Sequence, residues 1–179
     1  MSESQLELQL IVRAASGEHY AYEQLVIRYQ ALVYSVLLNL CRHRSLADDL
    51  LQMTFLKAWE KLNTYRNGSF RSWLCKIAVR EYLMHQRKHA RENKLTEALD
   101  LGDENSETKR DATESSLDLQ KALGLLRHED AQLIVMHIQI GFTHSEIATL
   151  MNMPLGTVKS KVRRGLNLIQ NTWESNSHE

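Results

Sequence analysis

Apolar residues recur at steps of three and four along most of this 179-residue chain. That spacing places them on one side of an α-helix, whereas no stretch shows the alternation bounded by turn residues that predicts a strand. The pattern predicts helices over Glu3–Ala15, Glu18–Arg42, Ser45–Leu62, Phe70–Glu92, Leu117–Leu126 and Glu129–Ile140, followed by a helical pair over Gly141–Leu168. A single proline and seven glycines agree with this pattern, and the predicted fold class is all-α.

The apolar pattern is interrupted once, between residues 92 and 116. From Glu92 to Asp118 nine acids stand against three cations, among Ser, Thr, Gly and Asn residues and without a sustained apolar stripe. Such a composition cannot bury a core and is typical of a linker. The sequence therefore predicts two small helical domains, residues 1–91 and 117–179, joined by a flexible acidic linker over residues 92–116.

The helical pair near the C-terminus carries its own start signals. Thr143 can cap the first helix, and Glu146 stands three residues later, as a capping box requires. Asn152-Met153 breaks the apolar period, and Pro154 suits the first turn of a second helix. In that second helix six apolar residues are expected to share one buried side: Leu155, Val158, Val162, Leu166, Ile169 and Trp173.

The opposite side of that second helix is basic and hydroxylic, and no acid occurs from Asn152 to Asn171. The candidate DNA contacts on this side are Gly156, Thr157, Lys159, Ser160, Arg163 and Arg164. Two helices joined by a tight turn, with such an outer face, form the helix-turn-helix layout, whose second helix enters the DNA major groove. The alternative is an ordinary helical hairpin with a solvated charged face, although such faces usually mix both signs of charge.

Three segments of the chain resemble the same protein family. The run PLGTVKSKVRRGLNLI, residues 154–169, resembles the segment of bacterial RNA polymerase sigma factors that reads the −35 promoter element, in the form of the small extracytoplasmic-function (ECF) group. Upstream, ADDLLQMTFLKAW, residues 47–59, resembles the ECF segment that docks on the clamp helices of the polymerase β′ subunit. The resemblance implies polymerase contacts at Asp48, Asp49, Gln52 and Met53, with Met53 standing where the family usually has an acid. As an alternative, the two aspartates favour the start of a core helix through its dipole.

A third segment, LNTYRNGSFRSWLCKIA, residues 62–78, resembles the ECF region that melts and reads the −10 element. The resemblance implies a pocket for an extruded base at Thr64, Tyr65, Arg66, Asn67 and Ser69. Basic residues would hold the melted strand: Arg71, Lys76, Arg80, Arg87 and Lys88. Aromatic rings among cations suit single-stranded DNA, because bases stack on the rings while the cations meet the backbone. For Phe70 and Trp73 the apolar spacing favours a core role instead.

Composition narrows the remaining classes of protein. The formal net charge is zero, so the chain alone is expected to bind DNA weakly, since affinity grows with the phosphates neutralised. No signal peptide and no membrane span are expected, and two cysteines, Cys41 and Cys75, fit a reduced cytoplasmic setting. The Cys41/His43 and His85/His89 pairs lack the spacing of a zinc site. With no catalytic motif either, we expect no metal, no cofactor and no enzymatic activity.

The predicted function is promoter-specific transcription initiation as an ECF sigma factor. The implied partners are bacterial core RNA polymerase, promoter DNA and an anti-sigma protein that holds the factor inactive. Two alternatives stay open. A stand-alone helix-turn-helix regulator predicts tight specific DNA binding by the isolated chain. An adaptor that sequesters an anti-sigma factor predicts that Lys159 and Arg163 are dispensable.

Overall fold

The chain forms two compact units, Met1–Glu107 (unit 1) and Thr108–Glu179 (unit 2), in a computed structural model. The structure describes residues 3–66, 68–97 and 121–176, with side chains described as far as 92 in unit 1 and from 121 to 171 in unit 2. Over these residues the regular structure is helical, with no strand. The predicted all-α class is therefore confirmed.

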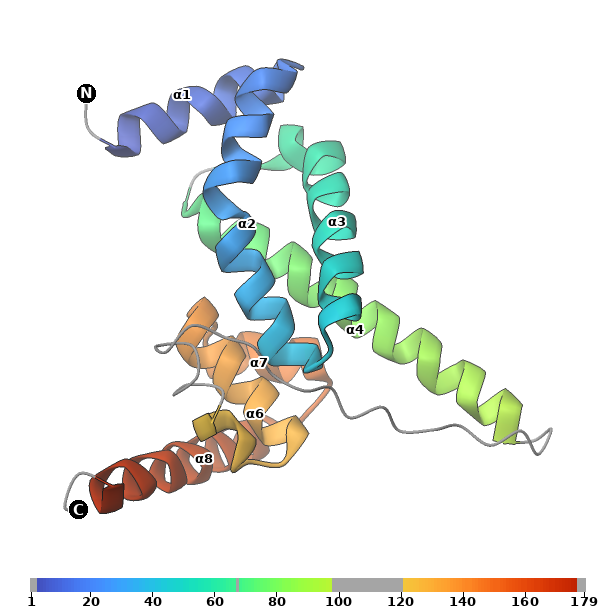
Figure 1. Ribbon diagram of the computed structural model, residues 1–179, viewed down its shortest axis with the longest axis vertical. Helices are drawn as coiled ribbons and strands as arrows, with labels where there is room; N and C mark the ends of the chain where they lie inside the picture. The colour runs from blue at the N-terminus through green and yellow to red at the C-terminus, as the bar shows by residue number, and fades with distance from the viewer. Residues whose placement is uncertain (1–2, 67, 98–120, 177–179) are drawn as a thin grey trace. The chain divides into compact units, whose positions relative to one another are not determined.

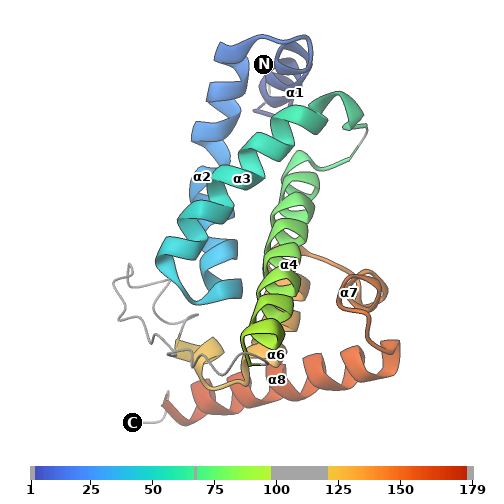
Figure 2. The same cartoon turned by 90° about the vertical axis from the view of Figure 1, so that its right-hand side faces the viewer.

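Unit 1 is built around one long helix. Its elements are α1 (Glu3–Ala15), α2 (His19–Cys41), α3 (Arg44–Lys61), the short 3-10 helix η1 (Leu62–Thr64) and α4 (Phe70–Glu97). Helix α2 packs against α1, α3 and α4, and α3 also packs against α4 (Figures 1 and 2). The shared core includes Leu25, Val33, Val36, Leu37 and Leu40 of α2 with Ala47 and Ala58 of α3 and Leu74, Ala78 and Tyr82 of α4.

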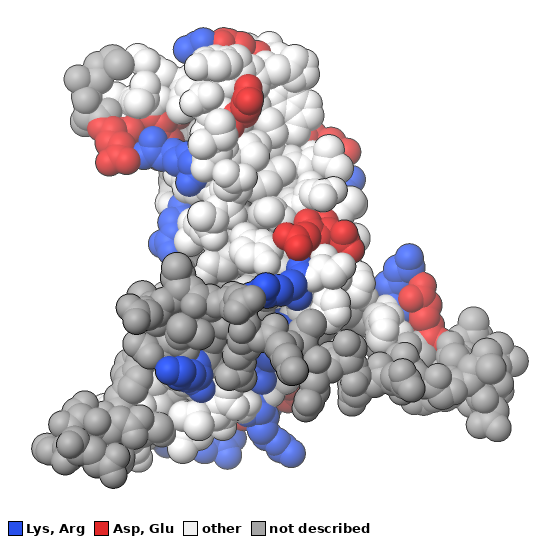
Figure 3. Space-filling view, viewed as in Figure 1, with Lys and Arg blue, Asp and Glu red and all other residues white. Residues whose placement is uncertain are grey.

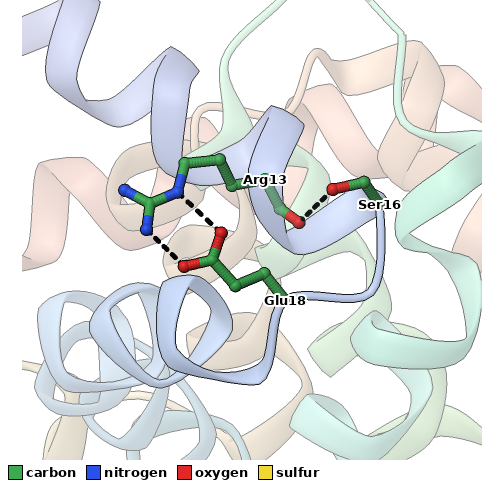
Figure 4. A network of polar contacts seen from close by, with 3 residues as sticks. All are labelled: Arg13, Ser16 and Glu18. Carbon is green, nitrogen blue, oxygen red and sulfur yellow. Dashed lines mark hydrogen bonds and ion pairs between the residues drawn. The ribbon is translucent and has the colours of Figure 1, made fainter.

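A tight turn joins α1 to α2. Gly17 adopts a φ of +96°, a left-handed conformation that glycine accepts without strain. Arg13 pairs with Glu18 across the turn, and the Ser16 hydroxyl donates to the Arg13 carbonyl oxygen at 2.7 Å (Figure 4). The hydrogen bond from Arg13 lowers the pKa of the Glu18 carboxyl. These contacts close the end of α1 with side chains and backbone that are near in sequence.

The turn between α2 and α3 corrects one prediction. Arg42 takes the left-handed conformation, with a φ of +57°, and its N–H donates to the Leu38 carbonyl at 2.8 Å. His43 then caps α3, because its ring Nδ1 accepts the Leu46 N–H at 3.2 Å. Ser45, where the sequence predicts this helix to begin because serine is a usual cap, lies one residue inside the helix and is exposed. Histidine is not a usual cap residue, so the sequence signal pointed to the serine.

Helix α2 is long and apolar enough to cross a membrane by length and composition alone. The sequence predicted no membrane span, so α2 differs from that expectation in length and composition. Core helices of globular proteins can be as long and apolar, and the residues that α2 buries against its neighbours give it that role in unit 1.

Helix α4 extends beyond its expected end. It continues to Glu97, so its last residues belong to the segment expected to form the start of the linker. The rest of the expected linker, from residue 98 to residue 116, lies outside the described residues.

Unit 2 contains α6 (His128–Ile134), the π-helical segment η2 (Val135–Ile140), α7 (His144–Met151) and α8 (Leu155–Asn176), after a helical stretch over 121–124. The first residues of the helix expected over Leu117–Leu126 lie outside the described part. Helix α8 packs against α6 and α7. The apolar residues that these segments bury are Ala122, Leu123, Leu126, Leu133, Ile134, Met136 and Ile140. Gly141, with a φ of +87°, ends η2 and turns the chain into α7.

The helix-turn-helix is formed by α7 and α8, and its predicted capping box is confirmed. The Glu146 N–H donates to the Thr143 hydroxyl at 3.2 Å, and the Thr143 N–H donates to the Glu146 carboxylate at 2.9 Å. Asn152 then takes the left-handed conformation, with a φ of +51°, and ends α7. The Pro154 carbonyl accepts from Thr157 and Val158, so the proline immediately precedes α8.

The buried side of α8 agrees with the prediction at three of its positions and differs at two. Val158, Val162 and Ile169 are buried and Leu166 is half-buried, but Leu155, the first residue of α8, is exposed. The Trp173 side chain lies outside the described residues. Gly165 is also buried: a Cβ built there would lie 2.5 Å from Ile134 Cδ1. Glycine thus permits the close approach of α8 to α6.

Candidate nucleic-acid interface

The exposed side of α8 carries the residues predicted to contact DNA. Gly156, Lys159, Arg163 and Arg164 are exposed, whereas Thr157 and Ser160 are half-buried. At about 100° per residue, Gly156, Lys159, Ser160 and Arg163 point away from the buried residues Val158, Val162, Gly165 and Ile169. The Ser160 hydroxyl donates to the Thr157 carbonyl at 2.9 Å, which leaves its oxygen lone pairs as acceptors. The helix therefore presents fixed cations and a hydroxyl acceptor on one side.

One cation of α8 has a different role, which the sequence did not reveal. The Lys161 ammonium lies 2.7 Å from the Glu129 carboxylate and 3.1 Å from that of Asp130, both on α6. The hydrogen bond to Glu129 raises the pKa of Lys161. The pairs join residues about thirty positions apart in sequence, beyond the reach of helical spacing arguments. Lys161 fixes α8 on α6 and belongs to the fold of unit 2.

Figure 3 shows mainly basic side chains over the part of unit 2 formed by α6 and α8, whereas both signs of charge occur over unit 1. This distribution agrees with the absence of acids from Asn152 to Asn171. A surface of one sign attracts phosphate, while mixed charges largely cancel. The exposed side of α8 thus has the charge that a DNA-binding helix needs.

The exposed face of α3 collects the four predicted polymerase contacts, Asp48, Asp49, Gln52 and Met53, all of which are exposed. Their spacing places them on adjacent turns, opposite the buried Ala47, Leu50, Thr54 and Ala58. Leu56, which the sequence analysis had assigned no role, extends this face and is 59% exposed. Met53, 42% exposed, and Leu56 stand three residues apart, so they are apolar neighbours on this face.

The capping alternative for the two aspartates loses its basis. Helix α3 starts at Arg44, so Asp48 and Asp49 lie in its second turn. The helix dipole acts mainly within the first turn. The helix dipole therefore does not account for the acids at these two positions.

The loop before α4 is held by its own hydrogen bonds. The Tyr65 hydroxyl donates to the Gly68 carbonyl at 2.6 Å, and the Arg66 guanidinium donates to the Asn63 carbonyl at 2.7 Å. The Thr64 hydroxyl donates to the Lys61 carbonyl at 2.6 Å. Ser69 caps α4, because its Oγ accepts the Ser72 N–H at 3.3 Å. Asn67 lies outside the described residues.

An aromatic cluster stands behind this loop. The Tyr65 ring lies 5.4 Å from that of Phe70 and 5.6 Å from that of Trp73, and Tyr29 of α2 adds a ring 5.4 Å from Phe70. Phe70 is buried, which confirms its core role, while Tyr65 and Trp73 are half-buried. Burial raises the pKa of Tyr65, so its hydroxyl stays a neutral donor. The loop thus places the half-buried Tyr65 ring against the half-buried Trp73 ring of α4.

The basic residues expected along α4 separate into two groups. Lys76, Arg80 and Arg87 follow one another at helical steps on the same side of the helix. Arg71 lies instead one turn before the buried Cys75, and its charge opposes the effect of burial on the pKa of that thiol. Lys88 pairs with Glu92 at 3.7 Å on another side. The structure therefore groups only three of the five expected cations.

Burial makes both cysteine thiols less acidic than a free thiol. Burial raises the pKa of Cys75 to about 11, and burial also raises the pKa of Cys41, whose Sγ lies 3.2 Å from the His43 carbonyl oxygen. Within the described residues no group of three or more His, Cys, Asp or Glu side chains is arranged to hold a metal ion.

Comparison with known proteins decides the family. Family models described as Sigma-70 region 2 and Sigma-70, region 4 match residues 25–92 and 116–169. The chain is 30% identical over 189 aligned positions to the ECF RNA polymerase sigma-E factor of Escherichia coli K12, with 96% of each chain covered. The chain belongs to the ECF group of the sigma-70 family. It is also 28% identical to the ECF RNA polymerase sigma factor SigE of Mycolicibacterium smegmatis, over 92% of this chain and 67% of that protein.

Solved structures agree with this assignment. The sigma factor RpoE of Bartonella quintana, solved with the anti-sigma factor NepR, is similar over 86% of this chain and 96% of that chain, with 25% identity and a TM-score of 0.60. CnrH, solved with the cytosolic domain of CnrY, shares the fold at 21% identity and a TM-score of 0.58, over 95% of this chain and 98% of that chain. The region 2 match spans most of α2, α3 and nearly all of α4, and the region 4 match contains the helix-turn-helix. This ECF sigma factor is thus a transcription initiation factor, and sigma factors bind RNA polymerase.

Proposed function

We propose that this ECF sigma factor binds core RNA polymerase through α3 and promoter DNA through α4 and α8. One observation carries the proposal: a single chain exposes an acidic and apolar face on a region 2 helix and an acid-free basic face on a region 4 helix. A stand-alone DNA-binding regulator has no need of the first surface. The nucleotidyl chemistry belongs to the polymerase, and the factor works in the cytoplasm, where that enzyme acts.

The polymerase contact is assigned to the α3 face. Asp48, Asp49 and Gln52 offer carboxylate and amide groups to the β′ clamp helices, and Met53 and Leu56 add apolar area beside them. A rim of charge around an exposed apolar centre is the usual composition of a protein interface. Because Met53 replaces an acid common in the family, this contact depends more on apolar burial.

The −10 element is assigned to the loop and basic side of α4. Thr64, Tyr65, Arg66 and Ser69 are assigned to an extruded base, with Tyr65 as the stacking ring, and Asn67 joins them by its place in the sequence alone. Lys76, Arg80 and Arg87 then follow the melted strand along the helix, and Arg71 and Lys88 contribute charge from its other sides. Stacking is worth about 1–3 kcal/mol per base, so one ring can select the flipped position.

The −35 element is assigned to α8. Lys159, Arg163 and Arg164 reach bases and phosphates, Ser160 and Thr157 offer hydroxyl groups, and Gly156 leaves room for the backbone to approach. Arginine with guanine is the commonest base-specific pair in the major groove. An anti-sigma protein is the proposed inhibitor, since both structural relatives were solved with such a partner or with the cytosolic domain of a partner.

Transcription with purified bacterial core polymerase tests these assignments, using promoter-containing genomic fragments with and without the sigma factor. We expect discrete new transcripts that Asp49→Ala and Arg163→Ala abolish or strongly reduce. The loss of one arginine–guanine pair corresponds to about 1–3 kcal/mol. Matched controls are Glu23→Ala and Arg127→Ala, which remove an exposed acid from α2 and an exposed arginine just before α6.

Two results would contradict the assignments. Transcription that depends on the sigma factor but is unchanged by Asp49→Ala would exclude the α3 contact as proposed. A specific footprint by the isolated chain without any transcript would favour the stand-alone regulator. Binding of Asp49→Ala to core polymerase, measured by competition with the wild type, separates a docking defect from a DNA-binding defect.

A further inference from the structure

Two histidines meet where the helix-turn-helix begins. The His144 ring, on the first residue of α7, lies 4.4 Å from the His137 ring of η2, at an interplanar angle of 31°. The His137 Nδ1 lies 2.8 Å from the Phe142 carbonyl oxygen. A carbonyl can only accept, so His137 donates through Nδ1–H. Both rings are half-buried and so remain accessible from solvent.

The charged groups around His144 come from each element packed against it. His137 belongs to η2 and Lys159 belongs to the exposed face of α8. The nearest acid along α7, Glu146, is bound to the N–H and hydroxyl of Thr143. Burial, His137 and Lys159 together lower the pKa of His144, in that order of size. In the free protein at neutral pH the imidazole is therefore mostly neutral.

Bound DNA favours the charged form of the His144 imidazole. In a helix-turn-helix the second helix enters the major groove while the first helix crosses the phosphate backbone. His144 is the first residue of that first helix, α7, and Lys159 lies on the exposed side of the second helix, α8, so a phosphate backbone crossed by α7 passes beside the histidine pair. The anion stabilises an imidazolium that the neighbouring cation otherwise opposes.

We propose that the His137–His144 pair is a proton-linked phosphate contact at the edge of the −35 surface, taking up a proton as the promoter backbone binds beside Lys159. The inference rests on the proposed role of α8. It adds a regulation that the family assignment does not contain: this sigma factor holds its promoter more tightly as the pH falls. Two rings so close together share one added proton rather than two, since like charges at that distance repel.

The direction in which promoter affinity changes with pH follows from the linkage between proton binding and DNA binding. The pKa of His144 is lowered in the free protein and rises in the complex, so binding takes up protons in the pH range between the two values. Affinity is therefore greatest at the acid end of this range and falls as the pH rises through the pKa of the complex. One proton at most is linked, which limits the change to about tenfold per pH unit.

The experiment measures binding of the reconstituted holoenzyme to a labelled promoter duplex selected from a random pool by the holoenzyme itself. Affinity is compared at constant ionic strength between about pH 6 and about pH 8, the range in which histidine titrates. Each variant is expressed relative to wild type at the same pH, so that titration of the polymerase cancels. The variants are His144→Gln, His144→Lys and a control, His19→Gln, which removes an imidazole that stacks on Trp59 far along the sequence.

We expect the wild type to lose about three- to tenfold more affinity than His144→Gln as the pH is raised across this range. His144→Lys keeps its cation at every pH, so it should bind at the alkaline end at least as tightly as the wild type does at the acid end. The His19→Gln control should keep the wild-type pH dependence. Thr143 and Glu146 still cap α7 in all these variants, so the helix keeps its start.

Identical pH dependence in wild type and His144→Gln overturns the inference while leaving the −35 assignment intact. A holoenzyme whose affinity for the duplex is unchanged by Arg163→Ala overturns the −35 assignment and the inference with it. The two failures are therefore distinguishable. A pH-independent gain in His144→Lys, together with a lost pH dependence in His144→Gln, supports the proposal.

Discussion

Gly165 offers the sharpest test of how unit 2 is packed. A Cβ at this position would lie 2.5 Å from Ile134 Cδ1, closer than carbon atoms approach in folded proteins, while Leu126 Cδ2 at 3.5 Å would make an ordinary contact. Ile134 is itself buried, with 3% of its surface exposed, so its side chain has little room to move. Gly165→Ala should therefore force α8 away from α6.

The magnitude comes from two opposing effects. Alanine gains about 1 kcal/mol over glycine inside a helix. Overpacking a core by one methyl group costs about 1–3 kcal/mol. We therefore expect Gly165→Ala to lower the free energy of unfolding of unit 2 by up to about 2 kcal/mol, whereas alanine at a glycine position without a clash would raise it.

The chain supplies a matched control in the same helix. A Cβ added at Gly156 would meet no neighbouring atom within 4 Å, so Gly156→Ala should leave unit 2 unchanged or slightly stabilised. Ile134→Val supplies a rescue, because it removes the clashing Cδ1 and leaves the Cγ1 position at 3.6 Å. Alone it costs about 0.5–1.5 kcal/mol. With Gly165→Ala the new methyl fills the vacated space, so the double variant should be no less stable than Ile134→Val.

Hydrogen exchange followed by mass spectrometry is the suitable assay, because peptides from α8 and α2 report separately on the two units and a global two-state analysis would mix them. Exchange in α8 should accelerate in Gly165→Ala, by about tenfold for each 1.4 kcal/mol lost, and exchange in α2 should stay constant. Equal protection in Gly165→Ala and Gly156→Ala would refute the steric argument. So would a double variant as unstable as the sum of both single changes.

Three further predictions concern local chemistry. His43→Ala removes the ring that accepts the Leu46 N–H, so hydrogen exchange in peptides from α3 should accelerate as expected for a loss of about 1 kcal/mol, and unchanged exchange would exclude the cap. Thr143→Ala breaks the capping box and should cost unit 2 about 1 kcal/mol, seen as faster exchange confined to α7 and its neighbours. Burial raises the pKa of Cys75 to about 11, so a thiol reagent near about pH 8 should label it slowly until the chain unfolds, and rapid native labelling would contradict its burial.

Local signals in the sequence predicted local structure well. Helix α1 has the predicted bounds, Glu3–Ala15, and the Thr143–Glu146 capping box forms as expected, since both depend on residues within one or two turns. These features need no knowledge of the rest of the chain.

Features that depend on tertiary contacts were missed. The pairs of Lys161 with Glu129 and Asp130 join two helices, and nothing in the spacing of α8 distinguishes Lys161 from its basic neighbours. Leu155 fits the apolar period of α8 but is exposed as the first residue of that helix, which the period alone does not indicate. The role of Leu56 required knowing which side of α3 is left uncovered.

The sequence identified candidate residues of the −35 surface, but it did not identify the contacts that orient α8. Lys161 and Gly165 lie on α8 yet face α6: the first pairs with acids there, and the second lets the two helices approach closely. Together they fix the position and rotation of α8 about its axis, and hence the direction in which Lys159, Arg163 and Arg164 point. A substitution that shifts α8 by overpacking should therefore weaken promoter binding although it removes no DNA contact. Gly165→Ala tests this coupling: reduced promoter affinity that Ile134→Val restores would show that packing, and not charge alone, sets recognition.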